Sequence, residues 1–178
     1  REGKWEKKNY TGIELAGKTL GLVGFGRIAR SLAKKAQALG MKIIYTDIVG
    51  AINDVDGCTF MSLEEVLKNA DFISLHIPFD KKKGATIGKA ELAMMKDGAY
   101  LVNCARGGVV DEAALIEALD SGKIAGAGVD VFEKEPTENM TLVNHPKVSV
   151  TPHIGASTKE AQKRIGAEVV ELISSFQF

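Results

Sequence analysis

The sequence predicts an α/β protein in which helices cover both faces of a doubly wound parallel sheet. Short apolar runs alternate with segments of helical period along almost the whole chain, and this order produces parallel strands joined by right-handed crossovers. The apolar runs are also nearly continuous, which is typical of strands buried on both faces. The 178 residues are enough for one hydrophobic core, and we expect residues 1–178 to form a single domain.

Six strands are expected from the apolar runs. The first run, KTLGLVG at residues 18–24, leads directly into glycines, as a strand entering a tight turn does. The run KIIYT at residues 42–46 predicts the second strand, and DFISL at residues 71–75 the third. The remaining strands are expected at residues 100–103, 126–131 and 148–151.

Helices are expected between these strands. Residues 27–39 have helical period, with an apolar face made of Ile28, Leu32, Ala36 and Leu39. Ser62 followed by Glu65 is a capping-box pattern that opens a short helix. Further helices are expected at residues 89–95 and from Asp111, as the N-cap, to about residue 121. Ser157 with Glu160 opens a closing helix whose apolar face is Ile165, Val169 and Leu172.

Composition excludes several classes of function. Lys plus Arg number 23 and Asp plus Glu number 23, so the chain lacks the electrostatic footprint of a nucleic-acid-binding protein. No apolar stretch is long enough to span a bilayer. The only cysteines are Cys58 and Cys104, and Cys104 is expected at a buried strand end, so reduced thiols and a cytoplasmic location are expected. We expect no metal site.

A glycine motif predicts a nucleotide site. Residues 24–29, GFGRIA, fit the pattern G-x-G-x-x-G/A between the first strand and its helix, and Asp47 closes the second strand. Gly24 permits a tight turn, and Gly26 lets the backbone and the helix N-terminus approach a pyrophosphate. Asp47 can accept hydrogen bonds from ribose hydroxyls and would repel a 2′-phosphate, which favours NAD over NADP. The alternative is a structural glycine turn with a solvent-facing Asp47.

Three polar residues, each just past a predicted strand, are candidates for catalysis. Arg106, Glu135 and His153 can converge because ligands of doubly wound sheets sit outside the carboxyl ends of the strands. Reduction of a 2-keto acid puts a proton on the carbonyl oxygen, and a histidine suits this proton transfer. A carboxylate orients the histidine ring, and an arginine can grip the substrate carboxylate or its carbonyl oxygen. Taken singly, each has a structural alternative: Arg106 could satisfy loop carbonyls, and Glu135 lies in a charged run that is typical of solvated side chains.

The other two histidines have weaker claims to a function. His145 precedes Pro146 in the irregular segment 133–146, and a surface or capping role is expected for it. His76 lies between the third strand and Pro78. It is expected to line the cofactor site or to be merely buried.

Three longer blocks make the sequence recognisable. Residues 102–111 (VNCARGGVVD), 130–136 (DVFEKEP) and 152–158 (PHIGAST) strongly resemble the D-isomer-specific 2-hydroxyacid dehydrogenases. The resemblance implies that Arg106 binds substrate, Glu135 supports the histidine and His153 is the proton donor. It also implies cofactor contacts at Arg27, Ile28, Asp47, His76, Ile77, Pro78, Cys104, Ala105, Arg106, Asp130, His153, Gly155 and Ala156.

The resemblance further implies a second, substrate-binding lobe, which we expect to be absent from this chain, with residues 1–16 acting as a hinge segment. This domain alone is then expected to bind NAD and to turn over poorly, because closure of two lobes excludes water. The family also implies a homodimer formed through the cofactor domain. The last block is most similar to members acting on a phosphorylated three-carbon hydroxy acid. Reductases of unphosphorylated keto acids, an NAD-sensing corepressor module and a regulator with an inactive site are the alternatives.

Overall fold

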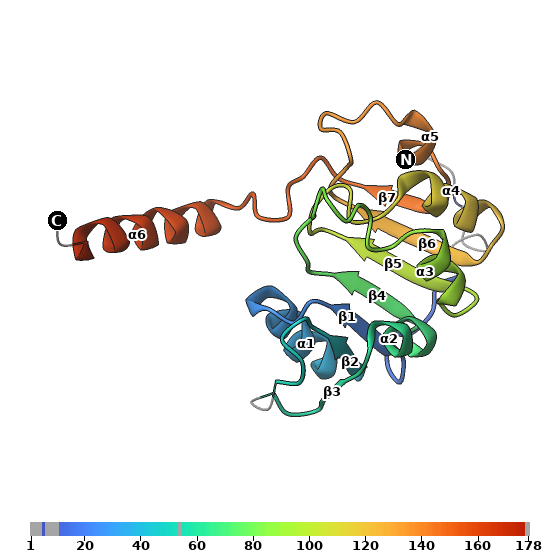
Figure 1. Ribbon diagram of the computed structural model, residues 1–178, viewed down its shortest axis with the longest axis horizontal. Helices are drawn as coiled ribbons and strands as arrows, with labels where there is room; N and C mark the ends of the chain where they lie inside the picture. Colours follow the sequence, from blue (N-terminus) through green and yellow to red (C-terminus); the bar gives the residue numbers. More distant parts are fainter. Residues whose placement is uncertain (1–4, 6–10, 53–54, 177–178) are drawn as a thin grey trace.

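The computed structural model describes residues 5, 11–52 and 55–176, and the described strands form one parallel sheet (Figure 1). The sheet order is β3-β2-β1-β4-β5-β6-β7. The predicted doubly wound architecture is confirmed, and all six expected strands are present with small shifts at their ends. Their bounds, with the additional β3, are β1 Thr19–Val23, β2 Lys42–Thr46, β3 Cys58–Phe60, β4 Phe72–Leu75, β5 Ala99–Asn103, β6 Ile124–Val129 and β7 Val148–Val150.

The order of the strands reverses between β1 and β4, which are hydrogen-bonded neighbours in the sheet. From β1 the chain first winds outward to β2 and β3, then returns to β4 and continues to β7 on the other side. In open α/β sheets such a reversal leaves a crevice at the carboxyl ends of the strands. We call this end of the sheet the carboxyl edge, and it is where the predicted site residues fall.

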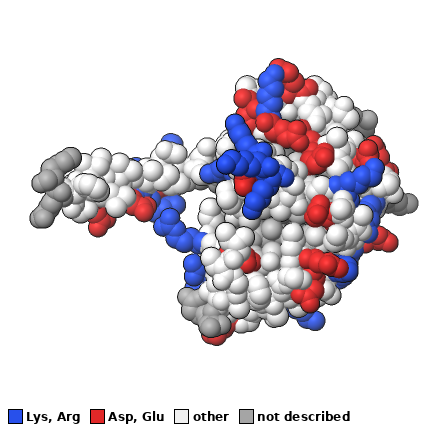
Figure 2. All heavy atoms as spheres, in the orientation of Figure 1, with Lys and Arg blue, Asp and Glu red and all other residues white. Residues whose placement is uncertain are grey.

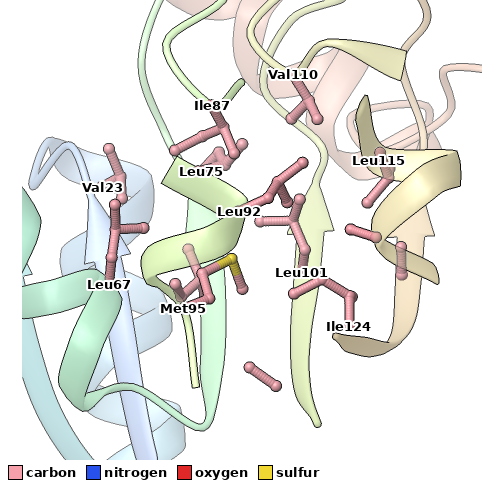
Figure 3. Close-up of a cluster of buried hydrophobic side chains, with 14 of the residues drawn as sticks. Val23, Leu67, Leu75, Ile87, Leu92, Met95, Leu101, Val110, Leu115 and Ile124 are labelled. Carbon is pink, nitrogen blue, oxygen red and sulfur yellow. The ribbon is translucent and has the colours of Figure 1, made fainter. Parts of the chain in front are cut away.

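Helices pack on both faces of the sheet (Figure 1). Helix α1 (Arg27–Ala38) shares one apolar cluster with β1 and β2. Helices α2 (Leu63–Asn69), α3 (Lys89–Met94) and α4 (Glu112–Asp120) share the larger cluster with β4, β5 and β6 on the opposite face. Figure 3 shows this cluster, in which Leu92 of α3 and Leu115 of α4 approach Leu101 of β5.

The apolar face predicted for α1 is only half correct, because Ala36 is buried and Leu32 packs against the core, but the other two residues are exposed. Ile28 is 76% exposed and Leu39 is 58% exposed, whereas the buried residues are Ala29, Ala33 and Ala36. Alanines face the sheet because their small side chains let the helix lie close to it, next to the stacked rings of Phe25 and Tyr45. Apolar periodicity therefore located the helix correctly but selected two of the larger side chains for the wrong face.

Two short elements were not predicted. Strand β3 pairs with β2 through Cys58–Phe60, but three residues are too few for a period-two pattern to be recognised. Helix α5 (Met140–Val143) lies inside the segment predicted to be irregular, capped by the side chain of Asn139. Its residue Leu142 is buried in the larger apolar cluster.

The closing helix α6 (Lys159–Ser175) projects away from the body of the domain (Figure 1). None of its residues is buried, so Ile165, Val169 and Leu172 are exposed. The N-cap is Thr158, which accepts the N–H of Ala161, and not the predicted Ser157. Among the described residues no helix is long and apolar enough to cross a membrane. Most of the predicted hinge segment, residues 1–4 and 6–10, lies outside the described residues.

Candidate active site

The glycine turn after β1 has the geometry that its sequence predicted. Gly24 adopts a φ of 86°, and a Cβ at this position would lie 2.6 Å from the carbonyl oxygen of His76. Only glycine meets both conditions without strain. Gly26 is the N-cap of α1, and nothing lies within 4 Å of the position its Cβ would take. The first amides of α1 have no side-chain cap, so they are free for an anion.

Asp47 lies beside this turn and is tied to it. Its Oδ2 accepts the N–H of Phe25 at 2.6 Å, and its Oδ1 accepts the N–H of Val49 at 3.1 Å. The carboxylate is half-buried and holds the end of β2 against the glycine turn. The alternative of a solvent-facing Asp47 is therefore wrong. Each carboxylate oxygen of Asp47 keeps a second lone pair that can accept a hydrogen bond from another donor.

A cavity of about 650 Å³ opens in front of the free amides of α1. Figure 2 shows the opening between α6 and the body of the domain, with Lys and Arg side chains at its rim. The predicted residues that line this cavity are Gly26, Arg27, Ile28, His76, Ile77, Pro78, Cys104, Ala105 and Arg106. Ala29 and the α6 residues Ala161, Arg164, Ile165 and Glu168 also line it and were not predicted.

The remaining predicted residues lie outside the lining of this cavity. Gly24 and Asp47 build the turn beneath it, and the others form a second group on the loops after β6 and β7: Asp130, Glu135, His153, Gly155 and Ala156. The predicted contacts thus divide into a cofactor cavity and a neighbouring polar group, both at the carboxyl edge.

His153 and Glu135 form a hydrogen-bonded pair across two loops. His153 Nδ1 lies 2.8 Å from Glu135 Oε2, and Glu135 Oε1 accepts the N–H of Phe132 at 3.0 Å. Because a carboxylate only accepts, Nδ1 carries the proton and Nε2 is left free for exchange with a ligand. The hydrogen bond from His153, with that from Phe132, lowers the pKa of Glu135, which keeps this carboxylate ionised.

Asp130 anchors the loop that carries His153. The residue is only 3% exposed, and its carboxylate accepts the Thr151 hydroxyl at 2.5 Å and the N–H groups of Ile154 and Gly155 at 2.9 Å each. Burial opposes ionisation, but these three hydrogen bonds outweigh it and the pKa of Asp130 lies below its ordinary value. His153 between them adopts a φ of 53°. The structure therefore gives Asp130 a loop-anchoring role that the sequence did not indicate.

Arg106 is exposed at the carboxyl edge after β5. Its Nη1 donates to the carbonyl of its neighbour Ala105 at 2.6 Å, as the structural alternative proposed, and its guanidinium keeps other donors free. The buried Asn103 shapes this loop, because its side chain donates to the Arg106 carbonyl and accepts the N–H of Ala105. The backbone of Arg106 is therefore fixed while its guanidinium can reach a ligand.

Gly107 is a site residue that sequence reasoning missed. A Cβ on Gly107 would lie 1.7 Å from the carbonyl oxygen of Phe132, so the Arg106 loop touches the Glu135 loop backbone to backbone. The two consecutive glycines after Arg106 could have indicated a close backbone contact. Periodicity and motif spacing, however, do not show which other segment of the backbone lies against these glycines. This contact sets the separation of the two loops.

Two other predictions are settled by burial. Cys104 is exposed, so its placement at a buried strand end is wrong, because β5 ends one residue earlier at Asn103. Its thiol pKa is raised by partial burial and by the charge of Asp130, so the thiol stays protonated. His145 is buried, contrary to a surface position, and its Nδ1 accepts the N–H of Lys147 in a capping role.

His76 lines the cofactor cavity, which is one of the two alternatives that the sequence predicted for it. Its Nε2 lies 3.0 Å from the Ser74 hydroxyl, and burial lowers the pKa of its ring. The ring is therefore neutral at pH 7. Within the described part of the chain no group of three or more His, Cys, Asp or Glu side chains could hold a metal ion.

Comparison with known proteins agrees with this geometry. A profile of the family described as D-isomer specific 2-hydroxyacid dehydrogenase, NAD binding domain, matches residues 1–155. The chain belongs to this family. It is thus an NAD-binding domain of the D-2-hydroxyacid dehydrogenases, and the free amides of α1, the open Gly26 and the adjoining cavity fit such a cofactor.

Individual relatives of this dehydrogenase domain carry several names. It is 49% identical over 97% of its length to a hydroxypyruvate reductase of Thermotoga maritima, covering 57% of that protein. It is 46% identical over 97% of its length to a D-3-phosphoglycerate dehydrogenase of Bacillus subtilis, covering 33% of that protein. The chain therefore spans between a third and somewhat over half of these curated relatives.

A solved structure shows the same fold with a cofactor in place. The D-lactate dehydrogenase of Aquifex aeolicus, complexed with NAD and lactic acid, superposes with a TM-score of 0.84 at 37% identity. The match covers 96% of this chain and 58% of that one. The similarity therefore extends over nearly the whole dehydrogenase domain.

Proposed function

We propose that this domain belongs to a D-3-phosphoglycerate dehydrogenase, which oxidises 3-phosphoglycerate to 3-phosphohydroxypyruvate with NAD. The dehydrogenase chemistry in this proposal rests on the Glu135–His153 pair, which leaves His153 Nε2 free at the carboxyl edge. The choice of 3-phosphoglycerate rests on the similarity to the D-3-phosphoglycerate dehydrogenase of Bacillus subtilis. This edge also holds the cavity that fits the cofactor. A homodimer and a cytoplasmic location, both expected from the sequence, stay predictions.

In this proposal each residue has one task. NAD supplies the acceptor for the hydride that leaves the C2 carbon of the hydroxy acid. His153 Nε2 takes the proton of the C2 hydroxyl, so the alcohol loses a hydride and a proton and becomes a ketone. Glu135 stabilises the imidazolium that forms, and Arg106 grips the substrate carboxylate through two parallel hydrogen bonds.

The cofactor contacts are proposed along the predicted set. The first amides of α1 would hold the pyrophosphate, and the free lone pairs of Asp47 would accept ribose hydroxyls. Arg27 and His76 line the same cavity. The nicotinamide end of the cofactor would lie next to Asp130, Gly155 and Ala156. The Asp130 carboxylate shapes the loop after β7 that carries the last two residues.

Replacing Gly26 by Ala tests the pyrophosphate position. The new methyl group meets no protein atom within 4 Å, so the free energy of unfolding should change by less than about 1 kcal/mol. The methyl group would occupy the space in front of the α1 amides, and the Kd for NAD should rise about tenfold or more. Calorimetric titration with NAD measures this. Gly12→Ala, also open around its Cβ and outside the cavity, is the matched control; equal affinities of both variants would contradict the site.

The choice of substrate is tested by comparing two acids that differ only in the phosphate. For the full-length protein we expect kcat/KM for D-3-phosphoglycerate to exceed that for D-glycerate by about a hundredfold, since a buried charged contact contributes a few kcal/mol. The experiment measures NADH formation by absorbance at matched acid concentrations. A preference for D-glycerate would favour the second candidate, a hydroxypyruvate reductase, which the Thermotoga maritima relative supports.

A further inference from the structure

Contacts other than the hydrogen bond between His153 and Glu135 hold the loop that carries Glu135. This loop comprises residues 132–139, between β6 and α5. Glu135 and the other charged residues of the loop, Glu133, Lys134 and Glu138, are exposed, so packing alone does not fix their positions. The carboxylate of Glu135 nevertheless has to stay within hydrogen-bond distance of His153.

Glu112, the first residue of α4, binds this loop at two points. Its Oε1 accepts the N–H of Glu133 at 2.8 Å, and its Oε2 accepts the side-chain amide of Asn139 at 2.7 Å. The backbone N–H of Glu112 donates in return to Glu133 Oε1 at 3.2 Å. One carboxylate thus connects both ends of the loop, with Glu135 between them.

The N-terminus of α4, which carries Glu112, is itself fixed to the core of the domain. The preceding residue, Asp111, caps α4 by accepting the N–H of Ala114, and its own N–H donates to the carbonyl of Ile87. Ile87 is fully buried in the larger apolar cluster. The positive end of the α4 dipole also favours the carboxylates of Glu112 and Glu133 beside it. Glu112 is therefore anchored to the core through Asp111, whereas the charged residues of the loop are exposed.

We propose that Glu112 is a positioning residue, which holds the Glu135 loop so that the Glu135 carboxylate meets His153. The inference rests on the proposed function, because it assumes that the Glu135–His153 pair serves proton transfer. Glu112 touches neither residue of the pair directly. Its effect on turnover must therefore pass through the loop and disappear when Glu135 can no longer act.

Glu112→Ala in the full-length protein should lower kcat about tenfold, because the Glu135 carboxylate is then no longer held in place against His153. The Kd for NAD should stay within about twofold, because Glu112 does not line the cofactor cavity. Glu117→Ala is the matched control: Glu117 lies on the same helix, is exposed and pairs with Lys89. Glu112→Gln retains one acceptor for the N–H of Glu133 and should recover kcat to within about threefold of wild type.

A double-mutant cycle distinguishes positioning from general stability. In a Glu135→Gln background, Glu112→Ala should change kcat by less than about twofold, because the carboxylate that Glu112 positions is gone. Thermal unfolding of every variant shows that it is folded during the assay. An equal drop in kcat in both backgrounds, or no drop in the wild-type background, would overturn the role of Glu112.

The same cycle separates the two proposals. If Glu135→Gln lowers kcat but the effect of Glu112→Ala is additive, only the positioning role fails. If Glu135→Gln leaves kcat at the wild-type value, the proposed proton-transfer pair fails, and the role of Glu112 fails with it. Coupling between the two substitutions supports both.

Discussion

Replacing His153 by Ala is expected to lower kcat of the full-length protein by about 10³-fold, within the range that general acid–base catalysis contributes. The substitution removes Nε2, which the Glu135 contact at Nδ1 leaves free for the substrate hydroxyl. Glu135 is a poor substitute as the base, because a carboxylate is a weaker base than an imidazole and one of its oxygens is held by the N–H of Phe132. The rate of NADH formation under saturating substrate and cofactor measures the effect.

The Kd for NAD should remain within about threefold of wild type in His153→Ala, because His153 does not line the cofactor cavity. His145→Gln is the control for loss of a histidine elsewhere: His145 is buried beside Asp120, away from the catalytic loops. Its kcat should change by less than about twofold. Turnover by His153→Ala within tenfold of wild type would reject His153 as the proton-transferring group.

Replacing Gly107 by Ala is expected to destabilise the domain by about 3 kcal/mol or more, with loss of most of the activity. The new Cβ would lie 1.7 Å from the Phe132 carbonyl oxygen, and the obstacle is backbone, so no side chain can turn away to relieve the overlap. The Arg106 loop and the Glu135 loop must then separate, which shifts the backbone of Arg106 relative to the loop that carries Glu135. Urea-induced unfolding measures the loss of free energy.

Gly128→Ala is the matched control for this substitution. Gly128 lies in β6 of the same sheet, and its Cβ would meet only the Val102 side chain at 3.8 Å, an ordinary contact. The control should change the free energy of unfolding by less than about 1 kcal/mol. If Gly107→Ala proved as stable as this control, the close approach of the two loops in the structure would be wrong.

Much of the candidate site could be predicted because its residues follow directly from strand ends. Gly24 and Asp47 directly follow β1 and β2, and Gly26 begins α1, so the apolar runs that predicted the two strands also located these residues. Parallel strands bring their carboxyl ends to one edge, so Arg106 and His153 were placed correctly without knowledge of the loops. The three family blocks then assigned the roles that spacing alone left open.

Other features depended on contacts between segments far apart in sequence. Half of the predicted face of α1 was wrong, because Ala29 and Ala33 are favoured by the short distance to the sheet, which apolar periodicity does not measure. The predicted cofactor contact of Asp130 stays a prediction, and the structure adds that its oxygens accept hydrogen bonds from Thr151, Ile154 and Gly155, more than twenty residues away in the chain. Glu112 carries no sequence signal at all for its contact with Glu133.

The fold class, the nucleotide turn and the edge of the sheet where chemistry can occur are predictable from the residues alone, because they follow from local periodicity and from the direction of parallel strands. How the loops at that edge meet is visible only in the folded chain: His153 contacts Glu135, Gly107 lies against Phe132, and Glu112 binds the Glu135 loop. Hydrogen bonds and close contacts between distant segments set the positions of these loops, and no local pattern encodes such contacts.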